Sequence, residues 1–296
     1  MSTSVDTAFI KQYEREAHLV FQREGSYLLP SVRNKPNVVG TTTTFQKIGT
    51  GVATTKARNS AITPMNVAHT APAATMEDFY AGDWHDKLDD AKINHDERGA
   101  LAKSGAFALG RKVDNQIVTL LDGTSQTAVA ITVTSMATVR ATMLELVEAL
   151  DANDVPNDGG RYGILTPRLH SQLMTVEEFA SGDYVDAIGK AFTKGAPIFN
   201  RWRAWNGVLW KVHTDMPGIT TASAKCFVYH RNSLGYGINK FAGNIAGNAG
   251  VSADITWHGD HAAWFINHMM SGGGVLIDDT GVIEGNFDDG AAIVTT

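Results

Sequence analysis

The sequence has a single cysteine, Cys226, among its 296 residues. An intramolecular disulfide and a metal cage built from cysteines are therefore excluded, and a reducing compartment is expected. No run of about 20 apolar residues is present, so we expect no membrane span. Charged side chains at Lys11, Glu14, Arg15 and Glu16 occupy the positions where a signal peptide would be apolar. We therefore predict that the protein has no secretory signal.

Positive charge is also scarce. The chain carries 25 Lys and Arg against 31 Asp and Glu, a formal net charge of -6. A protein dedicated to gripping nucleic acid needs a basic stripe or a positive balance. With 43% hydrophobic and 19% charged residues, the composition is that of a globular protein with a sizeable core. DNA beside such a protein would be contained more than bound.

Catalytic motifs are weak. Residues 105–112 resemble a phosphate-binding loop, but Arg111 stands where lysine belongs, and the segment lies within a predicted helix. We expect Gly105 and Gly110 to let another element approach this helix. Residues 271–274, Ser-Gly-Gly-Gly, predict a tight bend between strands. Cys226 lies inside an apolar strand, where thiols are usually inert.

Two groups of side chains are candidate metal ligands. The first group is His258, Asp260, His261 and His268. Imidazoles and a carboxylate are suitable ligands for zinc or iron. If the segment is a strand, however, these side chains alternate between its two faces and do not converge. The second group is Asp278, Asp279, Glu284, Asp288 and Asp289. Its spacing matches no calcium-binding loop, so we predict a solvated acidic edge. A metal-dependent hydrolase using His258, Asp260 and His261 stays a minor hypothesis.

The N-terminal third contains two segments suited to burial against a partner. Residues 4–24 place Phe9 and Tyr13 on the apolar face of a predicted amphipathic helix. Residues 41–48 and 52–58 are β-prone and flank a predicted turn at 49–51. A polar two-stranded hairpin of this kind is marginal alone in water, so it needs another surface.

The rest of the chain alternates helices and strands. A strand over 78–88 precedes the longest predicted helix, which is capped by Asn94 or Asp96 and runs to Leu121. The further predicted helices are 139–150 and 168–174. The further predicted strands are 129–133, 162–165, 207–213, 226–230, 254–258, 263–270 and 274–277.

Four stretches follow one another along the chain: Phe45-Gln-Lys-Ile-Gly49 through Lys56-Ala-Arg58, then Pro64-Met-Asn-Val-Ala-His69, then Asp78-Phe-Tyr through Trp84 with Asp89, Asp90 and Lys92, and then Ala108-Leu-Gly-Arg-Lys-Val-Asp114. These stretches and the order of the predicted parts resemble the Hong Kong 97-type capsid fold of tailed-phage major capsid proteins. The resemblance covers most of the chain and is strongest over residues 37–122.

The resemblance implies an α+β fold with four parts: an N-terminal arm (1–36), an extended β-hairpin loop (37–75), a peripheral domain with a long spine helix (76–123 and 236–296) and an axial α/β domain (124–235). It further implies a non-catalytic shell subunit without cofactors. Such subunits assemble as pentamers and hexamers into an icosahedral virion capsid around double-stranded DNA. A portal and possible decoration or scaffolding proteins are implied partners, and assembly is expected in the host cytoplasm. An encapsulin-type compartment is the alternative with the same fold.

Candidate inter-subunit contacts come from the arm, the loop and an aromatic pair. Trp202 and Trp205 lie beside Arg201 and Arg203, a combination typical of protein contacts, although core packing explains these tryptophans equally well. Some relatives of this fold crosslink through a loop lysine, but no acceptor asparagine matches here. The full set is Phe9, Tyr13, Phe45, Lys47, Lys56, Arg58, Trp202 and Trp205.

Overall fold

The computed structural model describes residues 22–89, 92, 97–180, 202–239 and 251–294. The predicted helix over 4–24, with Phe9 and Tyr13, lies almost wholly outside these residues. Its last three residues, 22–24, are described and are not helical. No helix among the described residues has the length and hydropathy to cross a membrane.

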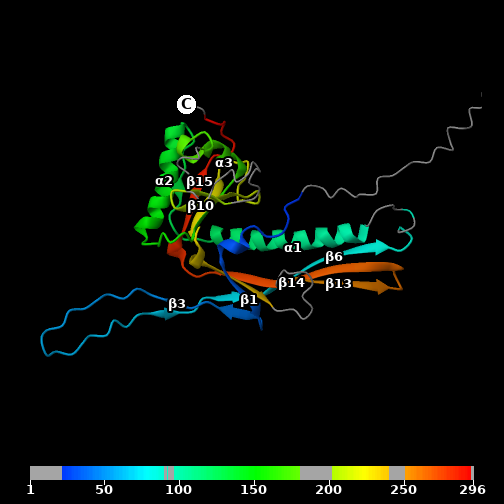
Figure 1. The fold of residues 1–296 in the computed structure, drawn as a ribbon, viewed down its shortest axis with the longest axis horizontal. Coiled ribbons are helices and arrows are strands. Elements are labelled where there is room, and N and C mark those ends of the chain that lie inside the picture. Colours follow the sequence, from blue (N-terminus) through cyan, green and yellow to red (C-terminus); the bar gives the residue numbers. More distant parts are fainter. Residues whose placement is uncertain (1–21, 90–91, 93–96, 181–201, 240–250, 295–296) are drawn as a thin grey trace, which may run out of the picture.

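A long helix and a five-stranded sheet form the elongated half of the molecule (Figure 1). Helix α1, Glu97–Asp122, has 26 residues and is about 39 Å long, which confirms the predicted spine helix. It lies along a sheet whose central strand is β14, Ala263–Leu276. The other strands are β1 (Arg33–Val38), β6 (Glu77–Asp86), β12 (Leu234–Asn239) and β13 (Val251–His258).

The central strand β14 corrects one prediction. The expected bend at 271–274 is wrong, because β14 runs unbroken through these residues and pairs with β6 and β12 there. The glycines serve close approach instead. A side chain at Gly273 would collide with the backbone carbonyl of Thr75, and one at Gly274 would collide with Leu120 of α1. The glycine run therefore lets the sheet touch both the loop and the helix.

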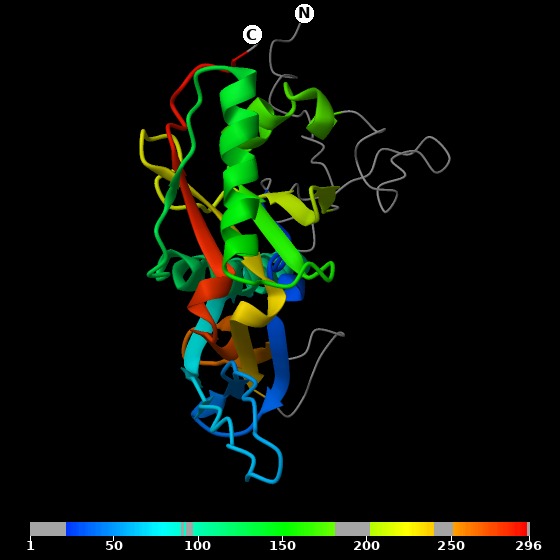
Figure 2. The same cartoon turned by 90° about the vertical axis from the view of Figure 1, so that its left-hand side faces the viewer.

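A six-stranded mixed sheet forms the other half, and the described residues include three helices beside it. Its order is β7-β15-β11-β8-β10-β9, and α2 stands against it (Figure 2). Ser135 caps α2 through a reciprocal bond with Thr138. The strands are β7 (Val129–Ala130), β8 (Arg161–Leu165), β9 (Arg203–Trp205), β10 (Val208–Val212), β11 (Ala224–His230) and β15 (Val282–Phe287). The helices are α2 (Met136–Ala152), α3 (Pro167–Leu173) and α4 (Glu177–Ala180).

The last strand, β15, lies in this second sheet, between β7 and β11. The predicted boundary, which placed all of 236–296 in the peripheral domain, therefore does not hold for residues after 281. Ile283 and Phe287 of β15 are buried in the core of the second sheet. The free energy of that burial, and not sequence proximity to β14, determines where the strand lies.

One buried cluster joins the two halves. Ile117 and Leu121 of α1 are fully buried against Phe227 and Tyr229 of the second sheet and Tyr236 of the first. The spine helix thus presents its apolar stripe to both sheets at its C-terminal end. Cys226 is fully buried in the neighbouring core, where burial raises the pKa of its thiol, as expected for an unreactive cysteine.

The extended loop projects from the body (Figure 1). Its arms pair as β2, Thr42–Thr44, with β5, Ala73–Thr75, and as β3, Lys47–Ile48, with β4, His69–Thr70. The predicted turn at 49–51 is wrong, because the Gly49 amide donates to the Ala68 carbonyl at 2.8 Å and extends the pairing of the two arms. Residues 50–66, here called the loop tip, contain no strand, and all are exposed.

Candidate assembly surfaces

Asp114 of the spine helix is the centre of a buried polar cluster. Its side chain is 0% exposed and accepts hydrogen bonds from Ser26 Oγ at 2.5 Å and the Leu28 amide at 3.0 Å. Arg23 Nε lies 3.4 Å away, and His213 Nε2 lies 3.3 Å away. These residues and Tyr27, here called the Asp114 cluster, join the arm base, α1 and the chain just after β10.

The charge of Asp114 is maintained by these bonds. Burial alone raises the pKa of a carboxyl group. Here hydrogen bonds from His213, from Ser26 and from the backbone amides of Tyr27 and Leu28 outweigh burial, and the pKa of Asp114 is lowered. The carboxylate is therefore ionised and satisfied, which is the condition under which a buried charge is tolerated.

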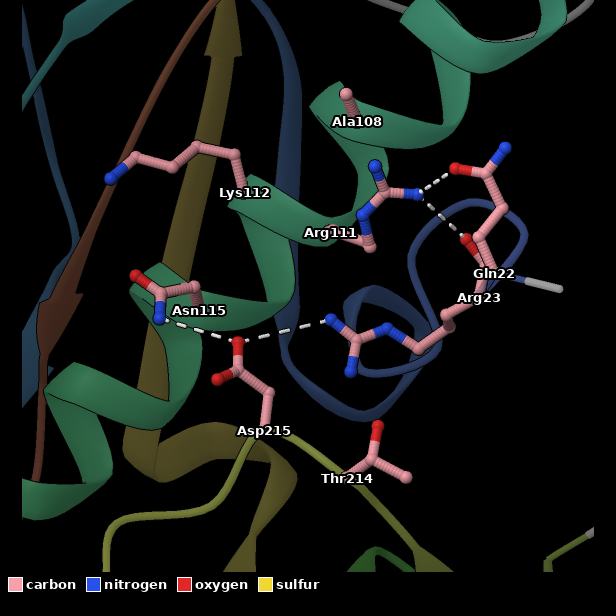
Figure 3. Close-up of a pocket in the computed structure, with 8 residues that line it drawn as sticks. All are labelled: Gln22, Arg23, Ala108, Arg111, Lys112, Asn115, Thr214 and Asp215. Atoms are coloured by element: carbon pink, nitrogen blue, oxygen red, sulfur yellow. Dashed lines mark hydrogen bonds and ion pairs between the residues drawn. The ribbon is translucent and has the colours of Figure 1, made fainter. Parts of the chain in front are cut away.

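An open cavity of about 430 Å³ lies beside this cluster (Figure 3). Arg111 Nη1 donates to Gln22 Oε1 at 2.6 Å, and Asp215 accepts from Asn115 at 3.3 Å and pairs with Arg23 at 3.9 Å. Because these groups bind one another, we interpret the cavity as part of the contact between the arm base and α1. Its lining is Gln22, Arg23, Ala108, Arg111, Lys112, Asn115, Thr214 and Asp215.

The structure confirms the predicted role of the two glycines in the weak phosphate-loop motif, which is to allow close approach to the helix. A side chain at Gly110 would collide with the backbone of Gly25, and one at Gly105 would collide with the His268 ring. The segment lies inside α1, so it provides no strand-to-helix turn for a phosphate. Both glycines let neighbouring segments approach the spine helix.

The base of the extended loop is held by Phe45. This side chain is 3% exposed and packs with Ala74 and Ile277 in a small cluster of its own. Arg33 and Lys35 of β1 place their cationic groups 5.8 and 6.0 Å from the Phe45 ring centroid, within the range of cation–π attraction. Phe45 therefore anchors the loop within its own subunit and offers little surface to a neighbour.

Most of the acidic C-terminal residues have partners, and the predicted solvated edge is wrong for Glu284 and Asp289, which are buried. Asp278 pairs with Lys47 at 2.9 Å, and Glu284 pairs with Lys225 at 3.2 Å. Asp289 is buried, and accepts from Thr166 at 2.6 Å and Thr220 at 2.8 Å. Asp279 accepts from Thr124, Ser125 and Gln126. Asp288 alone is exposed as predicted.

The far end of the first sheet has an exposed aromatic face opposite α1. Tyr80 and Trp84 of β6 are 67% and 46% exposed. The rings of His258 and His261 lie 5.1 and 4.7 Å from the Trp84 ring, between centroids. These histidines surround an indole. Asp260 Oδ2 lies 3.5 Å from His261 Nε2 in an exposed pair.

The remaining metal candidate, His268, points the other way. It is 4% exposed and lies against Gly105 of α1, where burial lowers its pKa. Among the residues that the structure describes, no three His, Cys, Asp or Glu side chains are grouped as a metal site. The hydrolase hypothesis therefore has no support in the described geometry.

The other predicted contact residues divide into buried and exposed. Trp205 is 6% exposed and packs with Phe179 and Trp210, so core packing explains it. Trp202 is half-buried against Tyr162, with ring centroids 4.9 Å apart. Lys56 and Arg58 are exposed on the loop tip. Phe9 and Tyr13 lie outside the described residues.

The fold is one that solved capsid structures share. The structure resembles the capsid of the cyanophage P-SCSP1u with a TM-score of 0.72 and 14% identity, over 97% of this chain and 95% of that one. It also resembles a protein of Mycobacterium phage Che8 (TM-score 0.67, 15% identity, 94% and 96% coverage) and the capsid of a native GTA particle (TM-score 0.69, 12% identity, 97% of each chain).

A family model described as phage capsid protein matches residues 5–289. The chain belongs to this family, and it is a structural major capsid protein with a Hong Kong 97-type fold and no enzymatic role. A search of curated protein sequences found no match. The shell-subunit prediction is confirmed, and the encapsulin and hydrolase alternatives are not favoured.

Proposed function

We propose that copies of this chain assemble as pentamers and hexamers into an icosahedral phage head that encloses double-stranded DNA. The loop tip is the observation that carries this proposal. Val52, Ile62 and Met65 are 79%, 76% and 57% exposed on a segment that projects away from the body. Three large apolar side chains at such exposure on one short segment favour an interaction site, and a second copy is the partner that a shell provides.

The two ends of the subunit are complementary. The loop tip carries Lys56 and Arg58 and no acidic residue. The far end of the first sheet, at the opposite side of Figure 1, combines Trp84 with the exposed acids Asp86 and Asp254 on one face. A contact between unlike patches is heterologous, and heterologous contacts close into rings when the rotation allows it. This supports ring-shaped capsomers.

The same charge balance supports containment of DNA without tight binding. A net charge of -6 gives little counterion release on contact with phosphates. We propose that assembly occurs in the host cytoplasm, with a portal at one vertex and with decoration or scaffolding proteins as further partners. The lone buried Cys226 is compatible with that reducing compartment.

Negative-stain microscopy tests shell formation directly. We expect purified full-length protein to form capsomers, tubes or closed particles as its concentration rises. A monodisperse monomer under all assembly conditions would overturn the proposal.

Disulfide trapping tests the proposed contact. One population carries Ile62→Cys, a second carries Tyr80→Cys, and the two are mixed before assembly. Native Cys226 is 0% exposed and gives a clean background. We expect a crosslinked dimer in particles, and none when Tyr80→Cys is replaced by Glu148→Cys, an exposed position on α2. Particles that form without the Ile62–Tyr80 crosslink would reject this contact while leaving shell formation intact.

A further inference from the structure

We infer that Lys47 and Asp278 are positioning residues, whose ion pair sets the direction of the extended loop and couples it to the junction between the two sheets. The inference rests on the assembly role proposed above for the loop. The pair lies where the last paired part of the loop, β3, meets the chain between β14 and β15. Lys47 Nζ lies 2.9 Å from Asp278 Oδ1.

Asp278 is held in place from its own side. Its carboxylate caps the short 3₁₀ helix Asp279–Gly281 by accepting from the Thr280 amide at 3.3 Å and the Thr280 hydroxyl at 2.8 Å. Its amide donates to the Ser233 carbonyl at 3.1 Å. The acceptor is therefore preorganised, and the lysine is the mobile partner of the pair.

The neighbouring residue ties this junction to the spine helix. Asp279 accepts hydrogen bonds from Thr124 Oγ1 at 2.7 Å, from the Ser125 amide at 3.1 Å and from Gln126 Nε2 at 3.1 Å. Residues 124–126 follow α1 after one intervening residue, Gly123. Residues 278–281 thus contact the loop, the end of the spine helix and the start of the second sheet, so a change in the angle between the sheets displaces Asp278 and, through it, Lys47.

The buried contacts of the loop base fix the position of the loop but not its direction. Thr43, Phe45 and Ala74 are buried there, and a two-stranded ribbon beyond them can swing. Lys47 adds a fixed point farther along the arm, two residues after Phe45. Both side chains of the pair are about one-third exposed, at 35% and 38%. Such a pair contributes little to global stability, so its loss is expected to affect the loop and not the folding of the subunit.

Distance measurement between spin labels on the full-length chain tests the inference. One label is placed at Ile62→Cys on the loop tip and the other at Glu148→Cys on α2. We expect Lys47→Met to shift and broaden the distance distribution in the unassembled subunit and to slow particle formation. The matched control is Lys56→Met, which removes an exposed lysine from the tip and is expected to leave the distribution unchanged.

A charge exchange separates the ion pair from other effects of substitution. Lys47→Asp combined with Asp278→Lys is expected to restore the native distribution, whereas either single change broadens it. Circular dichroism of each variant establishes that the subunit is folded, and Asp278→Asn replaces any variant that is not. An unchanged distribution in folded Lys47→Met and Asp278→Asn would overturn the inference. A broadened distribution with normal particle formation would uphold the ion pair and reject the assembly role of the loop.

Discussion

The Asp114 cluster and the loop tip represent opposite ways of using polar and apolar groups. Asp114 is a charge with no exposed surface, and it is paired with a cation and several donors within one chain. The loop tip has apolar side chains with Val52 79% and Ile62 76% exposed, on a segment that projects from the body. The polar groups of the Asp114 cluster find their partners within a single subunit. The apolar side chains of the loop tip stay exposed in a single subunit.

This difference separates folding from assembly. Groups that hold the subunit together are buried and satisfied, so their replacement should destabilise the monomer. Groups intended for a neighbour are exposed in the monomer, so their replacement should leave its stability unchanged. The loop base, with Phe45 buried and Lys47 partly exposed, lies between these extremes.

Asp114→Asn should give the largest effect. The substitution keeps the shape but leaves Arg23 without its buried counter-charge, which costs about 3–5 kcal/mol of unfolding free energy. Urea denaturation of the unassembled subunit measures it. The matched control is Asp288→Asn, an exposed carboxylate, for which a change under about 0.5 kcal/mol is expected. Equal effects from the two variants would contradict the assigned importance of the cluster.

Phe45→Ala should act next, and locally. Removing a buried phenylalanine costs about 3 kcal/mol, but the loop base can detach while both sheets stay folded. Hydrogen exchange should therefore accelerate at the Phe45 amide, which donates to Pro72, and stay slow in β11. Phe45→Leu keeps most of the volume and should cost less than about 1.5 kcal/mol. Global loss of protection in Phe45→Ala would place Phe45 in the main core.

Acid should weaken the junction at Asp279. Partial burial opposes ionisation, but bonds from Ser125, Thr124 and Gln126 lower the pKa of Asp279 to about 2, from an ordinary 3.8. A carboxyl with a lowered pKa in the folded state contributes stability above its unfolded pKa and loses it as pH falls toward the folded value.

The pH dependence of unfolding measures that contribution. Between pH 5 and about pH 2, wild type should lose more stability than Asp279→Asn, by on the order of 1 kcal/mol after allowance for solvent screening. Parallel curves for the two proteins would show that Asp279 does not carry this dependence.

The spacing of apolar residues predicted the helices and strands whose formation depends on neighbouring residues in the sequence. The spine helix follows from Leu109, Val113 and Ile117 at helical spacing, and the structure begins and ends it within a few residues of the expected limits. The strand over 78–88 was predicted for similar reasons and is β6, Glu77–Asp86. The order of parts was enough to indicate the capsid fold.

Features set by distant contacts could not be predicted this way. In the sequence, the glycine run around Gly273 predicts a bend. In the structure, the glycine is needed because the Thr75 backbone lies against it. Val52–Arg58 is β-prone but has no strand partner, because the loop arms pair farther along the chain. Asp114 lies next to the apolar stripe of α1. A carboxylate in that position is the one feature of the sequence that could have predicted a buried polar cluster. Its partners Ser26 and His213 are far away in sequence.

Replacing residues 50–66 with Asn-Gly should have the smallest effect on the subunit and a decisive one on the shell. The Gly49 amide already bonds the Ala68 carbonyl at 2.8 Å, so a three-residue turn made of Asn-Gly and Val67 can close the arms without strain on the base. Because the deleted side chains are exposed, the unfolding free energy should change by less than about 0.5 kcal/mol. Microscopy should show no closed particles, since the apolar and cationic tip is missing from every copy. Normal particles from this variant would mean that the tip does not serve assembly. A marked loss of stability would mean instead that the tip packs on its own subunit. The tip would then stabilise the folded subunit and would not be reserved for contact with a neighbour.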